Sequence, residues 1–171
     1  MATLFRELHL DLAMFKRREF YRLQQLEYLY DQGWLADDLR WLKARPQHRD
    51  VHVPELAPEE AAALLARAAD SPRRRVPKIL HEPGAVLNRV FNVMMADSYM
   101  QPHLHPGEEK IEKIALVEGR VAVLMFNDEG LAQRMVMLEA GGVGYVEVPA
   151  FTWHTYVILS AHAVTYETVS Y

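Results

Sequence analysis

The chain has 171 residues, of which half are hydrophobic and a quarter charged, and its formal net charge is −4. This composition is typical of one globular domain with an appendage, and the acidic balance argues against a nucleic-acid partner. Cysteine is absent, which excludes disulfides and thiolate metal sites. The first residues carry too many charges for a signal peptide, and no stretch is as long and apolar as a transmembrane helix. We therefore expect a cytoplasmic protein without a membrane partner.

Residues 1–45 have the pattern of amphipathic helix, with apolar residues at helical spacing: Phe5, Leu8, Leu12 and Phe15. The run from Leu8 to Leu12 also alternates like a short strand, and this alternative stays open. Apolar faces of this size are rarely left bare, so we expect the segment to pack on the outside of the main domain or to form a homodimer contact. Residues 45–56 contain two prolines and little periodicity. Residues 1–56 are thus predicted to be a helical extension and linker.

A second helix is predicted from Pro58 to about Ala69, because proline suits the first turn and the following glutamates suit the positive end of the helix dipole. Pro72 should end it. The basic cluster that follows, Arg73–Arg75, is either a solvated turn or a group beside a functional site.

From residue 87 onward, short alternating segments are separated by turn residues. We predict strands near 87–95, 98–105, 111–118, 120–126, 132–139, 143–149, 153–159 and 162–169. Eight short strands at this spacing favour a mainly β domain over residues 57–171, built as a small antiparallel barrel or jelly roll.

Three histidines and a glutamate in this β region predict a metal site. His103 and His105 are two residues apart, so on a strand they point to the same face. Glu112 and His154 follow at spacings that strands can bring to one cavity. Imidazole and carboxylate are ordinary ligands of a borderline divalent metal, and the sequence does not choose among Fe, Mn, Ni, Co and Zn. The rival carboxylates Glu108 and Glu109 lie in a Pro-Gly turn and are expected to be solvated.

The segments HLHPGEEKIE and VEVPAFTWHT resemble the two signature motifs of the cupin superfamily, and in detail those of the WbuC-type cupin-fold metalloproteins. The resemblance covers roughly residues 57–171 and includes Pro106, Lys110 and Glu112. It implies a cupin-type antiparallel β-barrel, a metal held by His103, His105, Glu112 and His154, and a setting in surface-polysaccharide metabolism. Where cupins usually have glycine before the last histidine, this chain has Phe151. Because phenylalanine resists positive φ, we expect the turn to differ in shape or the ring to cover the pocket mouth.

Five residues are candidates for binding a small molecule beside the metal: Arg89, Tyr99, Lys110, Trp153 and Tyr156. Arg89 stands in an apolar strand, where a guanidinium would bind a carboxylate or phosphate, or else pair with Glu147 or Glu167. Lys110 faces the side of Glu112 if the strand has begun by then. Tyr156 shares the face of His154, whereas packing alone would also explain Tyr99 and Trp153.

Four protein ligands on a metal that prefers six leave two positions for water or substrate. We therefore predict a metal-dependent enzyme, an isomerase or an oxygenase, that acts on a small polar or anionic metabolite. The alternative is a non-catalytic binding module in which the metal holds the barrel or a ligand.

Overall fold

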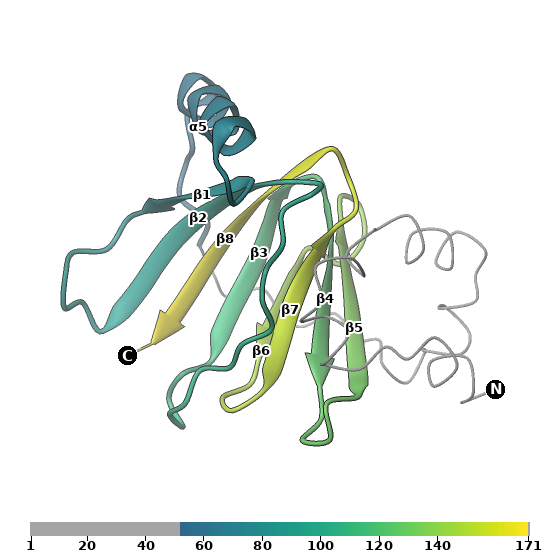
Figure 1. Ribbon diagram of the computed structural model, residues 1–171. Coiled ribbons are helices and arrows are strands. Elements are labelled where there is room, and N and C mark those ends of the chain that lie inside the picture. The colour runs from purple at the N-terminus through teal and green to yellow at the C-terminus, as the bar shows by residue number, and fades with distance from the viewer. Residues whose placement is uncertain (1–51, 171) are drawn as a thin grey trace.

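The computed structural model describes residues 52–170 as one helix and two antiparallel sheets that face each other (Figure 1). The larger sheet has the strand order β1-β2-β8-β3-β6, and the smaller has the order β5-β4-β7. Helix α5 spans Pro58–Asp70. The strands are β1 (Arg75–Ile79), β2 (Leu87–Met95), β3 (Glu112–Glu118), β4 (Arg120–Phe126), β5 (Ala132–Glu139), β6 (Tyr145–Val148), β7 (Trp153–Ile158) and β8 (His162–Ser170).

The main core lies between the two sheets. Alternate residues of strands β2 to β8 point into it, as the period of two requires. They include Ile114 from β3, Val123 from β4 and Tyr156 from β7, each no more than 1% exposed. The predicted mainly β fold class is therefore observed, as a jelly-roll-like pair of sheets that do not close into a barrel.

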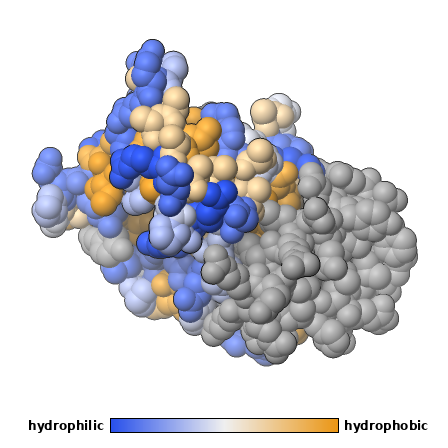
Figure 2. Space-filling model, turned by 45° about the horizontal axis from the view of Figure 1, so that its top comes forward, coloured by the Kyte–Doolittle hydropathy of each residue, from blue (hydrophilic) through white to orange (hydrophobic). Residues whose placement is uncertain are grey.

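A second core lies on the outer face of the larger sheet, where α5 packs. Leu64 and Ala68 of the helix contact Phe91 and Val93 of β2, and the rings of Phe91 and Tyr166 lie 5.2 Å apart. The helix begins and ends close to the predicted positions, with Pro58 in its first turn and an extended Ser71 before Pro72. Hydrophilic side chains dominate the surface on this side, with smaller apolar patches between them (Figure 2).

One predicted strand is absent, and one observed strand was not predicted. Residues 98–105 form no strand and make only one isolated bridge, between His103 and His154. Prolines 102 and 106 remove backbone donors there, so a continuous ladder is not available. Strand β1 was missed because Pro77 interrupts it, but β1 is an edge strand, where proline is tolerated.

The predicted helical extension of residues 1–45 and most of the predicted linker lie outside the described residues. Within residues 52–170, no helix is both long and apolar enough to cross a bilayer.

Candidate metal centre

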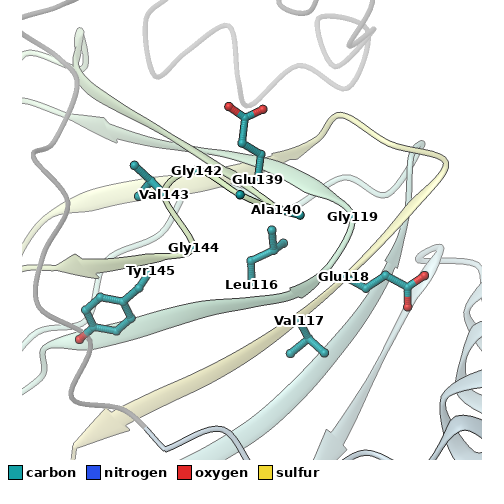
Figure 3. A pocket seen from close by; sticks show the side chains of 11 residues that line it. Leu116, Val117, Glu118, Gly119, Glu139, Ala140, Gly142, Val143, Gly144 and Tyr145 are labelled. Atoms are coloured by element: carbon teal, nitrogen blue, oxygen red, sulfur yellow. The ribbon is translucent and has the colours of Figure 1, made fainter.

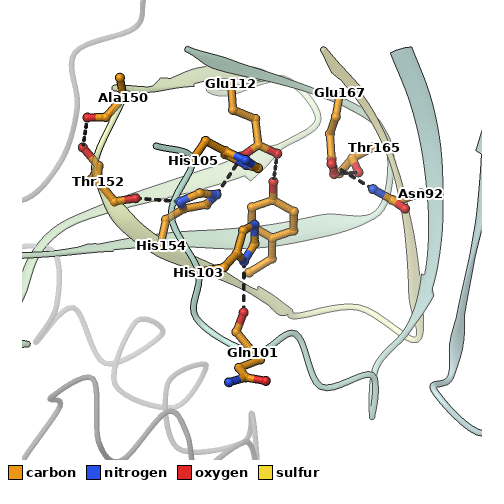
Figure 4. A network of polar contacts seen from close by, with 11 residues as sticks. Asn92, Gln101, His103, His105, Glu112, Ala150, Thr152, His154, Thr165 and Glu167 are labelled. Atoms are coloured by element: carbon orange, nitrogen blue, oxygen red, sulfur yellow. Dashed lines mark hydrogen bonds and ion pairs between the residues drawn. The ribbon is translucent and has the colours of Figure 1, made fainter. Parts of the chain in front are cut away.

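The structure brings His103, His105, Glu112 and His154 together, with one ligand atom from each lying within 4.8 Å of the others (Figure 4). Glu112 is the first residue of β3 in the larger sheet, and His154 belongs to β7 in the smaller one. His103 and His105 lie on the irregular segment between β2 and β3. The cluster therefore sits between the sheets and depends on three separate parts of the chain.

Backbone hydrogen bonds hold the irregular segment against β7. His103 N–H donates to the His154 carbonyl at 3.0 Å, and His154 N–H donates back to the His103 carbonyl at 2.9 Å. Two residues later, the His105 carbonyl accepts from Phe151 N–H at 3.1 Å. These bonds position two of the histidines without a regular strand.

The ring orientations are fixed by carbonyl groups. His154 Nδ1 lies 2.8 Å from the Thr152 carbonyl oxygen, and His103 Nδ1 lies 3.0 Å from the Gln101 carbonyl oxygen. A carbonyl only accepts, so each Nδ1 carries the hydrogen and donates it. This leaves the Nε2 of each ring available for a metal, which is the usual support of a histidine ligand.

The Glu112 carboxylate lies at the centre of the cluster. Its Oε2 is 2.6 Å from His154 Nε2 and 3.1 Å from His105 Nε2, and its Oε1 accepts a hydrogen bond from the Tyr156 hydroxyl. Burial alone would raise the pKa of Glu112, but the hydrogen bonds from His105, His154 and Tyr156 outweigh it and lower that pKa well below its usual range. Glu112 is therefore an ionised carboxylate inside the protein.

The pKa values of His154 and His103 are shifted in opposite directions. Burial lowers the pKa of His154, but its hydrogen bond to Glu112 and the charge of that carboxylate reverse the shift, so its pKa is raised overall. Burial and the neighbouring His154 lower the pKa of His103, which favours the neutral ring that a metal requires.

Three imidazoles and one carboxylate form a donor set that fits a borderline divalent metal such as Fe, Mn, Ni, Co or Zn. Glu112 and His154 are buried, whereas His103 and His105 are partly exposed. A ligand would therefore approach the cluster from the side of these two histidines. Glu108 and Glu109 are exposed, as expected.

A second buried carboxylate, Glu167 of β8, lies beside the cluster. Its oxygens accept hydrogen bonds from Asn92 at 2.8 Å and from Thr165 at 2.7 Å (Figure 4). Burial, followed by the charge of Glu112, raises the pKa of Glu167 to about 8. The sequence pattern predicted Glu167 only as a partner for Arg89. Its alternation with Thr165 and Ala163 on β8 was nevertheless a usable signal for an inward direction.

The five candidate ligand-binding residues do not converge. Only Tyr156 points to the metal cluster, where its hydroxyl meets Glu112. Trp153 alternates with the inward-facing His154, which places it on the opposite face of β7. Lys110 belongs to the turn before β3 rather than to the strand, since its N–H donates to the Gly107 carbonyl. Tyr99 lines a separate pocket together with Arg73 and Arg75.

Arg89 lies on the outer face of the larger sheet. It alternates with Phe91, which packs under α5, and its guanidinium donates to the Leu80 carbonyl at 3.3 Å. Arg89 pairs with neither Glu147 nor Glu167. Glu167 is held by Asn92 and Thr165 instead, and Glu147 contacts Tyr145 and Lys113. We therefore leave Arg89 out of the ligand site.

Phe151 takes the conformation that glycine would take. Its φ is 57°, so Phe151 adopts the positive φ that phenylalanine was expected to resist. Its side chain is 54% exposed, and its N–H donates to the His105 carbonyl.

A pocket of about 410 Å³ lies at the opposite end of β3 from Glu112 (Figure 3). Three glycines of the β5–β6 loop line it together with Glu118 and Glu139. These two carboxylates already pair with His162 and Arg120, at 2.8 and 3.4 Å. We assign no ligand to this pocket.

Comparison with known proteins gives one family and a group of similar structures. Residues 56–138 match the family described as Domain of unknown function (DUF6016). A comparison with curated proteins finds no match. The cupin domain of Cnp3 from Schizosaccharomyces pombe is 12% identical, with a TM-score of 0.43 over 57% of this chain and 64% of that one.

Two metabolic enzymes are also similar in structure. An oxalate oxidase in complex with the substrate analogue glycolate is 16% identical, with a TM-score of 0.47 over 60% of this chain and 53% of the other. The oxalate decarboxylase of Lactobacillus farciminis, in complex with formate, is 17% identical, with a TM-score of 0.46 over 55% of this chain and 28% of the other. The chain thus spans less than two thirds of the length of each of these proteins.

Proposed function

We propose that this protein is a metal-binding cupin of the WbuC type and an enzyme that acts on a small polar or anionic metabolite. The observation that carries the proposal is the convergence of three histidines on one ionised, buried glutamate. The Nδ1 hydrogen bonds of His103 and His154 to backbone carbonyls support it, because they direct both Nε2 atoms to one point. The WbuC resemblance adds sugar or nucleotide-sugar chemistry, in surface-polysaccharide metabolism, as the substrate class.

Four residues would hold the metal: His103, His105, Glu112 and His154. A divalent metal at this position supplies Lewis-acid polarisation of a substrate oxygen, or lowers the pKa of a bound water. Tyr156 orients Glu112 through its hydroxyl and is fully buried. Glu167, held by Asn92 and Thr165, offers a second carboxyl group on the same side of the core, where a protonated acid would donate to a substrate oxygen.

The second candidate is a non-catalytic module, in which the metal only holds the barrel or a ligand. His154 and Glu112 are buried, and this burial favours the non-catalytic module because a structural metal site is closed to solvent. The partial exposure of His103 and His105 favours the enzyme, since it gives small molecules a route to the metal. Water-proton relaxation of the manganese-loaded protein separates the two, because an enzyme site exchanges water with the solvent and a closed site does not.

The metal assignment is tested by elemental analysis of protein purified without added metal. His105→Ala and His154→Ala should each lower the bound metal per chain at least tenfold, because each removes an imidazole from the cluster. His52→Ala is the matched control, since His52 is exposed and lies outside the cluster, and it should retain the wild-type metal content. Full metal content in both cluster variants would overturn the assignment.

We further propose that residues 57–171 form the metal-binding domain and that residues 1–56 are an extension which covers one of its outer faces. The outer face of the smaller sheet supports this, because its side chains are apolar and buried, including Leu124, Met135 and Val157. A homodimer, with this face between two copies, is the alternative arrangement.

A further inference from the structure

The structure contains a basic pocket that belongs neither to the metal cluster nor to the two cores. Its volume is about 310 Å³, and it is lined by Pro72, Arg73, Arg75, Tyr99 and Gln101. None of these five described residues is acidic, and two of them carry a guanidinium. Two guanidinium groups therefore lie among the described lining residues of one pocket, on a chain whose net charge is −4.

Arg73 and Arg75 line this pocket, whereas the side chain of Arg74, which lies between them in the sequence, points elsewhere. Arg74 has a φ of 56°, in the left-handed region, and its Nε pairs with Asp97 at 2.9 Å. A non-glycine residue is rarely held at positive φ unless its surroundings fix it, and such residues are concentrated at functional sites. Here the Arg74 side chain pairs with Asp97, whereas Arg73 and Arg75 line the pocket.

Hydrogen bonds also anchor the segment after β2, which forms the other wall of the pocket. The Ser98 hydroxyl donates to the Arg73 carbonyl at 3.1 Å, and the Arg75 guanidinium donates to the Tyr99 carbonyl at 2.5 Å. These two hydrogen bonds join the Arg73 backbone and Arg75, the first residue of β1, to the segment after β2, so they hold the two sides of the pocket together. A preorganised site of this kind loses little entropy when it binds a ligand.

We propose that this pocket binds a phosphoryl group, the terminal phosphate of a small phosphorylated metabolite. A planar guanidinium can donate two parallel hydrogen bonds to the oxygens of a tetrahedral oxyanion, and Arg73 and Arg75 both line this pocket, with Tyr99 and Gln101 beside them. Arginine is preferred for this task because its planar fork matches phosphate oxygens in direction as well as in charge.

The phosphoryl site is connected to the metal cluster through one short segment. Gln101 lines the pocket, and its carbonyl oxygen accepts the hydrogen bond from His103 Nδ1. A phosphate bound beside Gln101 would therefore restrain the residue that orients His103. The site does not need the metal, however, and the inference stands independently of the proposed enzyme.

The test uses the full chain stripped of metal by a chelator, with inorganic phosphate as the probe. Titration calorimetry and broadening of the phosphate ³¹P resonance should show binding to the wild type. Arg73→Gln should weaken this binding at least tenfold, because hydrogen bonds to a charged group are lost. Arg67→Gln removes the same charge from the exposed face of α5 and should leave phosphate binding unchanged.

Arg75→Gln should weaken phosphate binding at least as much. However, Arg75 also donates to the Tyr99 carbonyl, so its replacement would disturb the fold as well. Arg73→Gln is therefore the decisive variant, because the Arg73 side chain is exposed. His105→Ala should still bind phosphate with wild-type affinity, which separates this site from the metal cluster. Equal phosphate affinity in Arg73→Gln and the wild type, or no binding by the wild type at millimolar phosphate, would overturn the proposal.

Discussion

Two non-glycine residues within the described part of the chain, Arg74 and Phe151, have positive φ, and each lies beside a proposed ligand site. The left-handed conformation costs an L-residue about 1–2 kcal/mol relative to glycine. Arg74 gains an ion pair with Asp97 in return. The Phe151 ring is more than half exposed, so its burial offsets little of this cost.

Replacement of Phe151 should therefore separate the backbone cost from the role of the ring. We expect Phe151→Gly to be more stable than Phe151→Ala by about 1 kcal/mol, because both variants lack the ring and only glycine takes positive φ readily. Chemical denaturation of the two variants measures the difference in the free energy of unfolding.

Both Phe151 variants should keep the wild-type metal content, since the Phe151 contact with His105 is made by backbone N–H. Equal stability of the glycine and alanine variants would show that φ at this position relaxes freely.

Helix α5 is the element that covers the outer face of the larger sheet. Leu64 is 5% exposed and packs against the β2 and β8 side chains of the second core. The metal cluster lies on the other face of this sheet, because Glu112 points between the sheets with Ile114. Stability and metal binding should therefore respond separately to changes in the helix.

We expect Leu64→Ala to lower the free energy of unfolding by about 2–4 kcal/mol, because it leaves a cavity between α5 and the sheet. Leu131→Ala is the matched control, since Leu131 is 42% exposed, and it should cost less than about 1 kcal/mol. Urea unfolding measures both. The metal content of the folded Leu64→Ala protein should stay at the wild-type value; its loss would mean that the two faces of the sheet are coupled.

At the scale of the whole molecule, the smaller sheet is apolar on both faces. Val123 and Val136 point into the core, whereas their neighbours Leu124 and Met135 point outward and are also fully buried. A sheet that faced water on its outer side would alternate apolar and polar residues instead. This face therefore requires a cover, and the apolar pattern of residues 1–45 makes that segment the best candidate.

Deletion of residues 1–45 should consequently expose the outer face of the smaller sheet, and we expect the shortened protein to aggregate or to change its oligomeric state. Size-exclusion chromatography with light scattering measures this directly. A shortened protein that stays soluble with unchanged oligomeric state and metal content would contradict the prediction.

Local sequence patterns were enough to predict the mainly β class, helix α5 and the residues of the metal cluster. In β3, this alternation places Ile114 and Leu116 on the same face as Glu112; Ile114 lies in the core and Leu116 packs against it. Such patterns succeed because the period of a strand or a helix depends only on its own backbone.

The tertiary structure decided what lies on each face, and here the sequence failed. Alternation gives the relative direction of side chains but not which side is the core, and β2 has apolar neighbours on both sides because α5 packs on its outer face. The charges of Arg89 and Glu167 therefore did not reveal which face of the larger sheet each side chain occupies. The strand predicted at 98–105 is also absent. Backbone hydrogen bonds to His154 of β7 and to Phe151 position His103 and His105 there without a ladder. Contacts between segments so far apart in the chain arise only when the sheets assemble.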